Sequence, residues 1–159
     1  MKKARAAAVA VILGTLAINS NATGATGARI YRLNATMDPR QVVTVSNKPW
    51  PVPPAYSKSR GTFTGTFNEA TGRLSWRITF SGLASPKLRI VDIHYGPPGR
   101  FGAFLARACA GCKSGQRGVI KVKRSARKDI AAGKAWVTLI TERYPNGVIR
   151  GQIKARKTA

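Results

Sequence analysis

Histidine, cysteine and acidic residues are scarce in this chain. Its 159 residues include one histidine, two cysteines and five Asp or Glu residues. A zinc site needs three or four protein ligands, and a histidine-dependent catalytic triad could only be centred on His94. Neither a Gly-x-Ser-x-Gly motif nor another nucleophile signature accompanies that histidine. The composition therefore favours a protein that is not an enzyme, with no cofactor.

Long apolar runs are also missing. The longest run, residues 6–18, is shorter than the roughly 20 residues that a helix needs to cross a bilayer. Basic residues precede it and small residues follow it, which is the pattern of a secretory signal peptide. We expect this signal peptide to span residues 1–25, with cleavage near Ala22 or Ala25. The protein is therefore predicted to be secreted or periplasmic, without a transmembrane span.

The scarcity of acids leaves the chain strongly basic. Its 28 Lys and Arg residues give a formal net charge of +23. Three of them lie in the predicted signal peptide, so 25 basic and five acidic residues leave a net charge of +20 on the exported part. Such a field attracts nucleic acids, anionic lipid surfaces and acidic polysaccharides. A basic surface with no specific partner is the alternative, and export argues against nucleic acid as the natural partner.

A strong β-hairpin pattern occupies residues 61–80. Side chains on a strand point alternately to opposite faces, and here the large apolar residues share one face: Phe63, Phe67, Leu74, Trp76, Ile78 and Phe80. The turn between the two runs ends at Gly72, which can adopt a positive φ without steric cost. We therefore predict a hairpin with one buried and one basic face.

The rest of the chain repeats this pattern of short strands. Pro and Gly turns separate the runs. Residues 125–133 indicate a helical turn, and the apolar residues 101–108 are read as either a strand or a helical turn. Further strands are expected over residues 28–37, 41–45, 87–95, 119–122, 135–142 and 148–153. Many short strands with turns between them predict an all-β fold, an antiparallel β-sandwich or Greek-key barrel. We expect one domain over residues 28–154 and a flexible basic tail over residues 155–159.

Short motifs along the chain resemble the CHRD (chordin-type) domain. They follow the family's order and include Val52-Pro53-Pro54, Gly61 to Thr66, Ser81-Gly82-Leu83, Ala132-Gly133-Lys134 and Ile149-Arg150-Gly151-Gln152. The resemblance implies an extracellular antiparallel β-sandwich, Greek-key or immunoglobulin-like. In chordin such domains belong to a secreted antagonist of growth factors, and in bacteria they occur alone in small exported proteins. The animal ligand does not carry over, because a shared fold does not fix a function.

Two positions depart from the family pattern. Family members commonly carry His-x-His where this chain has Asp92-Ile93-His94, and often a histidine where it has Ile140. Asp92 and His94 are two residues apart on a strand, so they project to the same side and could supply two metal ligands. The alternative is a hydrogen-bonded histidine beside an aspartate that is paired with an arginine. We expect the alternative, and no metal.

Cys109 and Cys112 form a C-x-x-C pair. In a cytosolic βαβ context this spacing indicates redox catalysis, whereas an exported all-β protein meets an oxidising compartment where disulfides persist. A structural disulfide is therefore favoured over redox catalysis and over zinc. Closing so short a loop contributes at most about 1–2 kcal/mol, so reduction should leave the fold intact.

The strongest candidate for a binding surface is a basic run without acids near the middle of the chain. Its members are Lys113, Arg117, Lys121, Lys123, Arg124, Arg127 and Lys128. Binding of phosphates by such a run would depend on salt and not on sequence, and the lack of interleaved aromatics argues against base stacking.

The sequence thus predicts an exported, non-enzymatic module at the cell envelope, which binds an unidentified ligand or has a structural role. Its partner could be an anionic envelope polymer or another envelope protein. The alternative function is binding of a polyanion (cell-wall polymer, lipopolysaccharide or nucleic acid) through a basic face. A metal-dependent or redox enzyme using Asp92 and His94, or the cysteine pair, is the least favoured function.

Overall fold

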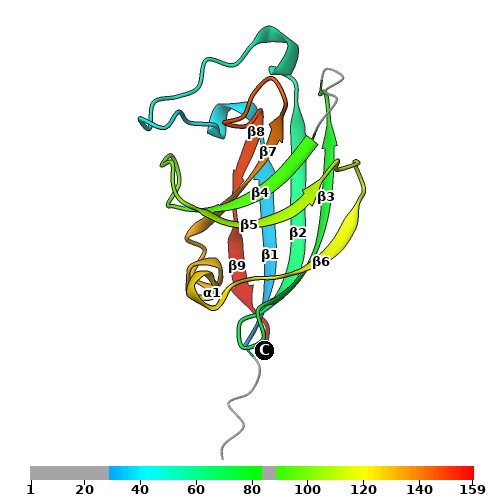
Figure 1. The fold of residues 1–159 in the computed structure, drawn as a ribbon, viewed down its shortest axis with the longest axis vertical. Helices are drawn as coiled ribbons and strands as arrows, with labels where there is room; N and C mark the ends of the chain where they lie inside the picture. Colours follow the sequence, from blue (N-terminus) through cyan, green and yellow to red (C-terminus); the bar gives the residue numbers. More distant parts are fainter. Residues whose placement is uncertain (1–28, 84–88) are drawn as a thin grey trace, which may run out of the picture.

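Two antiparallel β-sheets pack face to face in this protein (Figure 1). The structure is a computed structural model, and it describes residues 29–83 and 89–159. The predicted signal peptide lies outside the described residues. The all-β antiparallel sandwich predicted from the sequence is confirmed.

The first sheet has five strands in the order β6-β3-β2-β1-β9. These strands are β6 (Arg117–Lys121), β3 (Arg73–Ser81), β2 (Arg60–Asn68), β1 (Ile30–Met37) and β9 (Lys154–Lys157). The predicted hairpin forms β2 and β3, and Phe63 pairs with Ile78 across it. Gly72 closes the turn with a φ of 77°, the left-handed conformation that a residue without a Cβ adopts readily.

The second sheet has four strands in the order β5-β4-β7-β8. These strands are β5 (Phe104–Ala110), β4 (Arg89–Tyr95), β7 (Ala135–Thr141) and β8 (Ile149–Gln152). β4 lies between β5 and β7, and its register with β5 shifts twice, between Val91 and Asp92 and between Ile93 and His94. β7 and β8 form the predicted last hairpin.

Within residues 29–83 and 89–159, helical structure is confined to short segments. α1 (Arg124–Ala131) falls where the helical turn was predicted, and the 3-10 helices are η1 (Pro39–Gln41) and η2 (Pro54–Tyr56). No helix in the described residues has the length and apolarity to span a membrane. The predicted strand over residues 41–45 is wrong, because Asp38 caps η1 and Val43 makes only an isolated bridge to Pro49.

The core lies between the two sheets. Every second residue of the strands points inward, and the largest fully buried side chains in this layer include Phe63, Phe67, Leu74, Ile78, Ile93, Leu139 and Ile149. Full burial of one such side chain contributes about 1.5–3 kcal/mol. The outer face of the five-stranded sheet is thereby left largely to polar and charged residues, whereas that of the four-stranded sheet carries an aromatic cluster that includes His94, Phe104 and Trp136.

The predicted flexible tail over residues 155–159 is wrong. Residues Lys154–Lys157 form strand β9, which pairs with β1 from Asn34 to Tyr31. Thr158 continues the pairing with a backbone bond to the carbonyl oxygen of Ile30. The sequence analysis did not predict this strand because three of its four residues are basic. The inward-facing residues Ile153 and Ala155 were the available signal. An edge strand needs little apolar surface, because backbone hydrogen bonds hold it to its neighbour.

The predicted disulfide joins Cys109, on β5, to Cys112 in the loop that follows. Cys112 is fully buried, and its backbone N–H bonds to the carbonyl oxygen of Arg89. Because the closed loop is short, we expect a reductant to lower the melting temperature by only about 2–8 °C, the equivalent of about 1–2 kcal/mol for a chain of this size. Thermal scans with and without reductant measure this shift. A loss of secondary structure on reduction at 25 °C would contradict the prediction.

Candidate functional site

The outer face of the five-stranded sheet carries a concentration of basic side chains. Alternation along the strands points Arg32 outward from β1, Arg77 from β3, Arg117 from β6, and Lys154 and Arg156 from β9; all five are exposed. Their inward neighbours, such as Leu33 and Ile78, are buried in the core. Because successive side chains on a strand point to opposite faces, apolar residues face the core and the basic residues between them face the surface.

Strand pairing sets these basic residues directly opposite one another. Arg32 is the cross-strand partner of Arg156, and Arg77 is that of Arg117. Arg73 faces Lys121 in the same way, with the outward pair of Ser75 and Val119 lying between it and the pair of Arg77 and Arg117. Like charges directly opposite across a strand pair are destabilising, so this face holds unfavourable contacts that a bound anion would relieve.

Small polar side chains fill the middle of the same face. Together with the basic residues they line a shallow groove of about 810 Å³, which includes Asn34, Thr64, Thr66 and Ser75. None of the residues that line the groove is acidic. The groove thus has two basic sides, formed by β1 and β9 and by β3 and β6, around a floor of hydroxyl and amide groups.

The basic run predicted from the sequence is only partly in this groove. Arg117 lines it and Lys121 lies on the same face, whereas the remaining residues sit in the loop after Cys112 or on α1 and its N-cap. Arg127 is not free to bind a ligand, because its guanidinium donates to the carbonyl oxygens of Val122 and Ala70. Instead it holds α1 against the β2–β3 turn.

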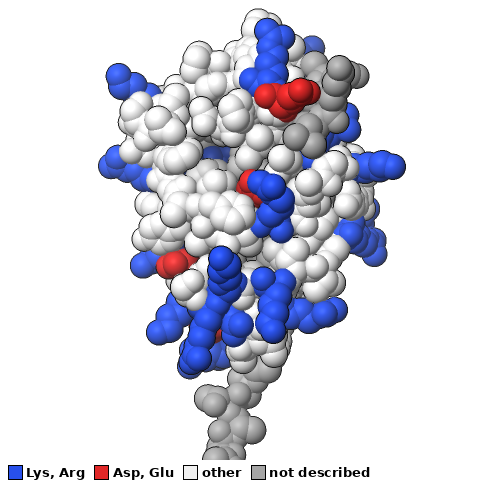
Figure 2. Space-filling view, viewed as in Figure 1, with Lys and Arg blue, Asp and Glu red and all other residues white. Residues whose placement is uncertain are grey.

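The opposite outer face has a different character. β4 and β5 pass in front of the other sheet in Figure 1. The same face in Figure 2 is largely uncharged, with a basic side chain beside an acidic one near its middle and further Lys and Arg at its rim and near the end that carries α1. On this face Asp92 is buried and accepts two hydrogen bonds from Arg107, at 2.9 and 3.1 Å. Both oxygens of the carboxylate are therefore engaged by an arginine, as the sequence analysis expected.

His94 lies beside Asp92 in an aromatic cluster. Its ring stacks on Trp136 with centroids 4.4 Å apart, and its Nδ1 lies 3.2 Å from the carbonyl oxygen of Gly102. Groups of three or more His, Cys, Asp or Glu residues that could hold a metal do not occur in the described ranges. His94 is thus placed as the hydrogen-bonded histidine that we expected.

Burial lowers the pKa of His94 below its usual range, and the positive charge of Arg150 acts in the same direction. The folded protein therefore keeps this histidine neutral to a lower pH than the unfolded chain, which binds a proton near pH 6.5. The folded state therefore loses nothing from this group well above pH 6.5, where the histidine is neutral in both states. It is destabilised as the pH falls through 6.5, because the unfolded state takes up the proton.

We therefore expect the free energy of unfolding to decrease between about pH 7.5 and pH 5.5, the range around the unfolded pKa. His94 is the only histidine, so the His94→Gln variant should lose most of this dependence. Urea unfolding at a series of pH values measures both proteins. Equal pH dependence in the two proteins would show that another group titrates.

The fold is an antiparallel β-sandwich with a basic groove on the outer face of its five-stranded sheet. The chain belongs to the CHRD domain family, whose match covers residues 33–153. CHRD is not a known enzyme family. No curated protein and no solved structure matched the chain.

Sequence reasoning missed most of the groove. Arg32 and Arg156 are at opposite ends of the described chain and meet only because β1 pairs with β9. The available signal was the polar face of the hairpin, where Arg73, Ser75, Arg77 and Thr79 alternate with apolar residues. That pattern identifies an exposed basic face but does not reveal which other strands extend it.

Proposed function

We propose that the protein is an exported module of the cell envelope that binds an acidic polymer in the groove of its five-stranded sheet. One observation carries the proposal: outward basic residues are paired with each other across the strands, and none of the residues lining the groove is acidic. The signal-peptide pattern supports the envelope location. The net charge supports attraction of a polyanion from a distance.

The composition of the groove favours an acidic carbohydrate polymer or a teichoic-type polymer. The floor residues Asn34, Thr64 and Thr66 offer hydrogen bonds to sugar or polyol hydroxyls, while the basic sides face carboxylates or phosphates. Trp76 is among the residues that line the groove, but its side chain is buried in the core and only 5% of the residue is exposed. Without an exposed aromatic in the groove there is no platform for stacking bases.

Two variants with the same loss of charge test the proposal. The groove variant changes Arg32, Arg77, Arg117 and Arg156 to Ser. The control variant changes Lys113, Lys123, Arg124 and Lys128 to Ser, which are exposed members of the predicted basic run outside the groove. Each basic residue near an anionic surface contributes about 1 kcal/mol. The groove variant should therefore bind at least about a hundredfold more weakly, since tenfold corresponds to 1.4 kcal/mol.

Calorimetric titration with heparin and with lipoteichoic acid, over a series of salt concentrations, measures the affinities. We expect binding by the wild type to weaken as salt rises, and the control variant to retain most of its affinity. An equal loss in both variants would indicate a non-specific charge effect. A loss confined to the control variant would place binding at α1 and refute the groove.

A further inference from the structure

A second cavity, separate from the groove, lies on the outer side of the four-stranded sheet near β8. It has a volume of about 370 Å³, and its lining includes Arg40, Gln41, Asn47, Pro98, Arg150 and Gln152. Arg40, Asn47 and Pro98 are exposed, so the cavity opens to solvent between the loop that follows β1 and the loop that follows β4. Its volume is within the range of pockets that hold small molecules.

Arg150 is a buried cation without a carboxylate partner among the described residues. Its residue surface is 3% exposed. Nη2 donates to the carbonyl oxygens of Arg100 at 2.8 Å and Pro97 at 3.5 Å, and the guanidinium lies 3.9 Å above the ring of Trp136. Nη1 is buried and has no hydrogen-bond partner in the described structure. Burial lowers the pKa of Arg150 to about 10, which reflects the cost of removing this charge from water.

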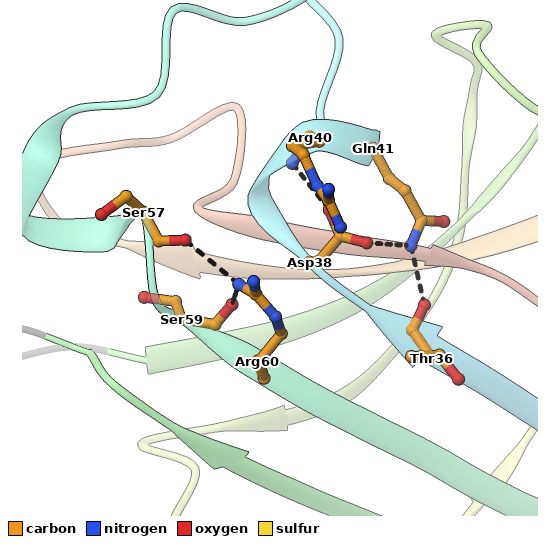
Figure 3. Close-up of polar contacts among 7 residues, drawn as sticks. All are labelled: Thr36, Asp38, Arg40, Gln41, Ser57, Ser59 and Arg60. Atoms are coloured by element: carbon orange, nitrogen blue, oxygen red, sulfur yellow. Dashed lines mark hydrogen bonds and ion pairs between the residues drawn. The ribbon is translucent and has the colours of Figure 1, made fainter.

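Asp38 lies opposite Arg150 in an isolated β-bridge, but its carboxylate is already engaged. Asp38 exchanges backbone hydrogen bonds with Arg150, but its carboxylate accepts from Arg40 and from Gln41 (Figure 3). The side chain of Gln41 also donates to the carbonyl oxygen of Thr36 (Figure 3). Asp38 therefore makes no ion pair with the guanidinium of Arg150 in the described structure.

Gln152 adds a second unpaired polar atom to the same cavity. It is two residues from Arg150 on β8, so both side chains project from the same face of the strand. Its Nε2 donates to the carbonyl oxygens of Gly96 at 3.1 Å and Gly133 at 2.9 Å, which fixes the orientation of the amide. Its Oε1 is buried and accepts no hydrogen bond in the described structure. A buried acceptor without a donor is costly, as is a buried donor without an acceptor.

We propose that this cavity binds a small organic anion that also carries a hydroxyl group. The oxyanion accepts a hydrogen bond from Nη1 of Arg150, and the hydroxyl donates to Oε1 of Gln152. One ligand thereby satisfies both unpaired groups and supplies the missing countercharge. Carboxylates and phosphate esters both have this chemistry, because each offers the oxygens that a guanidinium prefers.

Glucuronate, glucose 6-phosphate and glucose are the probes. The first two present a carboxylate or a phosphate beside hydroxyl groups, and glucose is the uncharged control. Amide chemical-shift titration of the whole protein locates any binding: we expect saturable shifts at residues 96–101 and 149–152 with one or both anions. Saturation by only one of them assigns the ligand as a carboxylate or as a phosphate ester. The groove variant should respond as the wild type does, which separates this cavity from the proposed polymer site.

Three variants test the assignment of residues. Arg150→Lys keeps the charge but loses the planar fork, and we expect at least tenfold weaker binding. Arg40→Ala removes a charge at the exposed rim and should also weaken binding, with little risk to folding. Arg60→Lys is the matched control, because this guanidinium also donates to backbone carbonyls, those of Ser57 and Ser59 (Figure 3), but lies outside the cavity.

Weaker binding in Arg150→Lys and Arg40→Ala, with unchanged binding in Arg60→Lys, supports the proposal. Absence of saturable shifts with either anion would overturn it and assign the unpaired atoms to water. Equal shifts with glucose, or unchanged anion affinity in Arg40→Ala and Arg150→Lys, would overturn it as well.

Discussion

Replacement of Phe63 by alanine is expected to lower the free energy of unfolding by about 3–5 kcal/mol. Phe63 is fully buried at the middle of β2, between Ala35 on β1 and Ile78 on β3. Truncation removes its apolar contacts and leaves a cavity that rigid neighbouring strands cannot fill. Since domains are commonly stable by only 5–15 kcal/mol, this one change would remove a large part of the total.

Urea unfolding followed by circular dichroism measures the effect, with Phe104→Ala as the control. Phe104 is 56% exposed on the outer face of β5, and its loss should cost at most about 0.5 kcal/mol. Similar losses in the two variants would contradict the assignment of the core to the layer between the sheets.

Gly151→Ala should also destabilise the protein strongly, by about 1–3 kcal/mol or more. A Cβ at this position would lie 2.4 Å from the carbonyl oxygen of Thr36 and 3.0 Å from Cγ of Met37. Thr36 and Met37 belong to β1, in the other sheet, so the methyl group would push β8 away from the first sheet. Because the nearest contact is with backbone, no side-chain rotation relieves it.

Hydrogen exchange shows where the strain of this variant acts. The amide groups of Asp38 and Arg150 bond to each other's carbonyl oxygens across this junction, at 3.0 and 3.2 Å, and we expect both to lose protection in Gly151→Ala. Gly99→Ala is the comparison, because its Cβ meets nothing within 4 Å and only its positive φ is strained. Unchanged protection at Asp38 in Gly151→Ala would contradict the close approach of the sheets.

The core of the fold could be predicted because it follows from local patterns. The alternation through Leu74, Trp76 and Ile78 needs no partner strand to identify the buried face, and Gly72 marks the turn. β9 could not be predicted in the same way. Its stability comes from backbone bonds to β1, and side-chain composition carries little information about such bonds.

Candidate sites depend on strand order, which the sequence does not state. The basic run from Lys113 to Lys128 is continuous in sequence but is divided in space between β6, α1 and their connections. Arg150 and Gln152 were recognised as part of a family motif, yet the cavity they line also needs Arg40 from a distant loop. Residue spacing along one segment therefore identifies single candidate residues, but it does not identify the residues from distant segments that line the same site.

The pairing of β9 with β1 also has a consequence for where the chain can be shortened. The family match ends at residue 153, immediately before β9 (Lys154–Lys157). A protein cut there would expose the backbone groups between Tyr31 and Asn34 that bond to β9, an open strand edge that other chains can join. The charged last strand covers that edge and, being rich in lysine and arginine, discourages further strands from adding to it. We therefore expect β9 to reduce edge-to-edge aggregation of the protein.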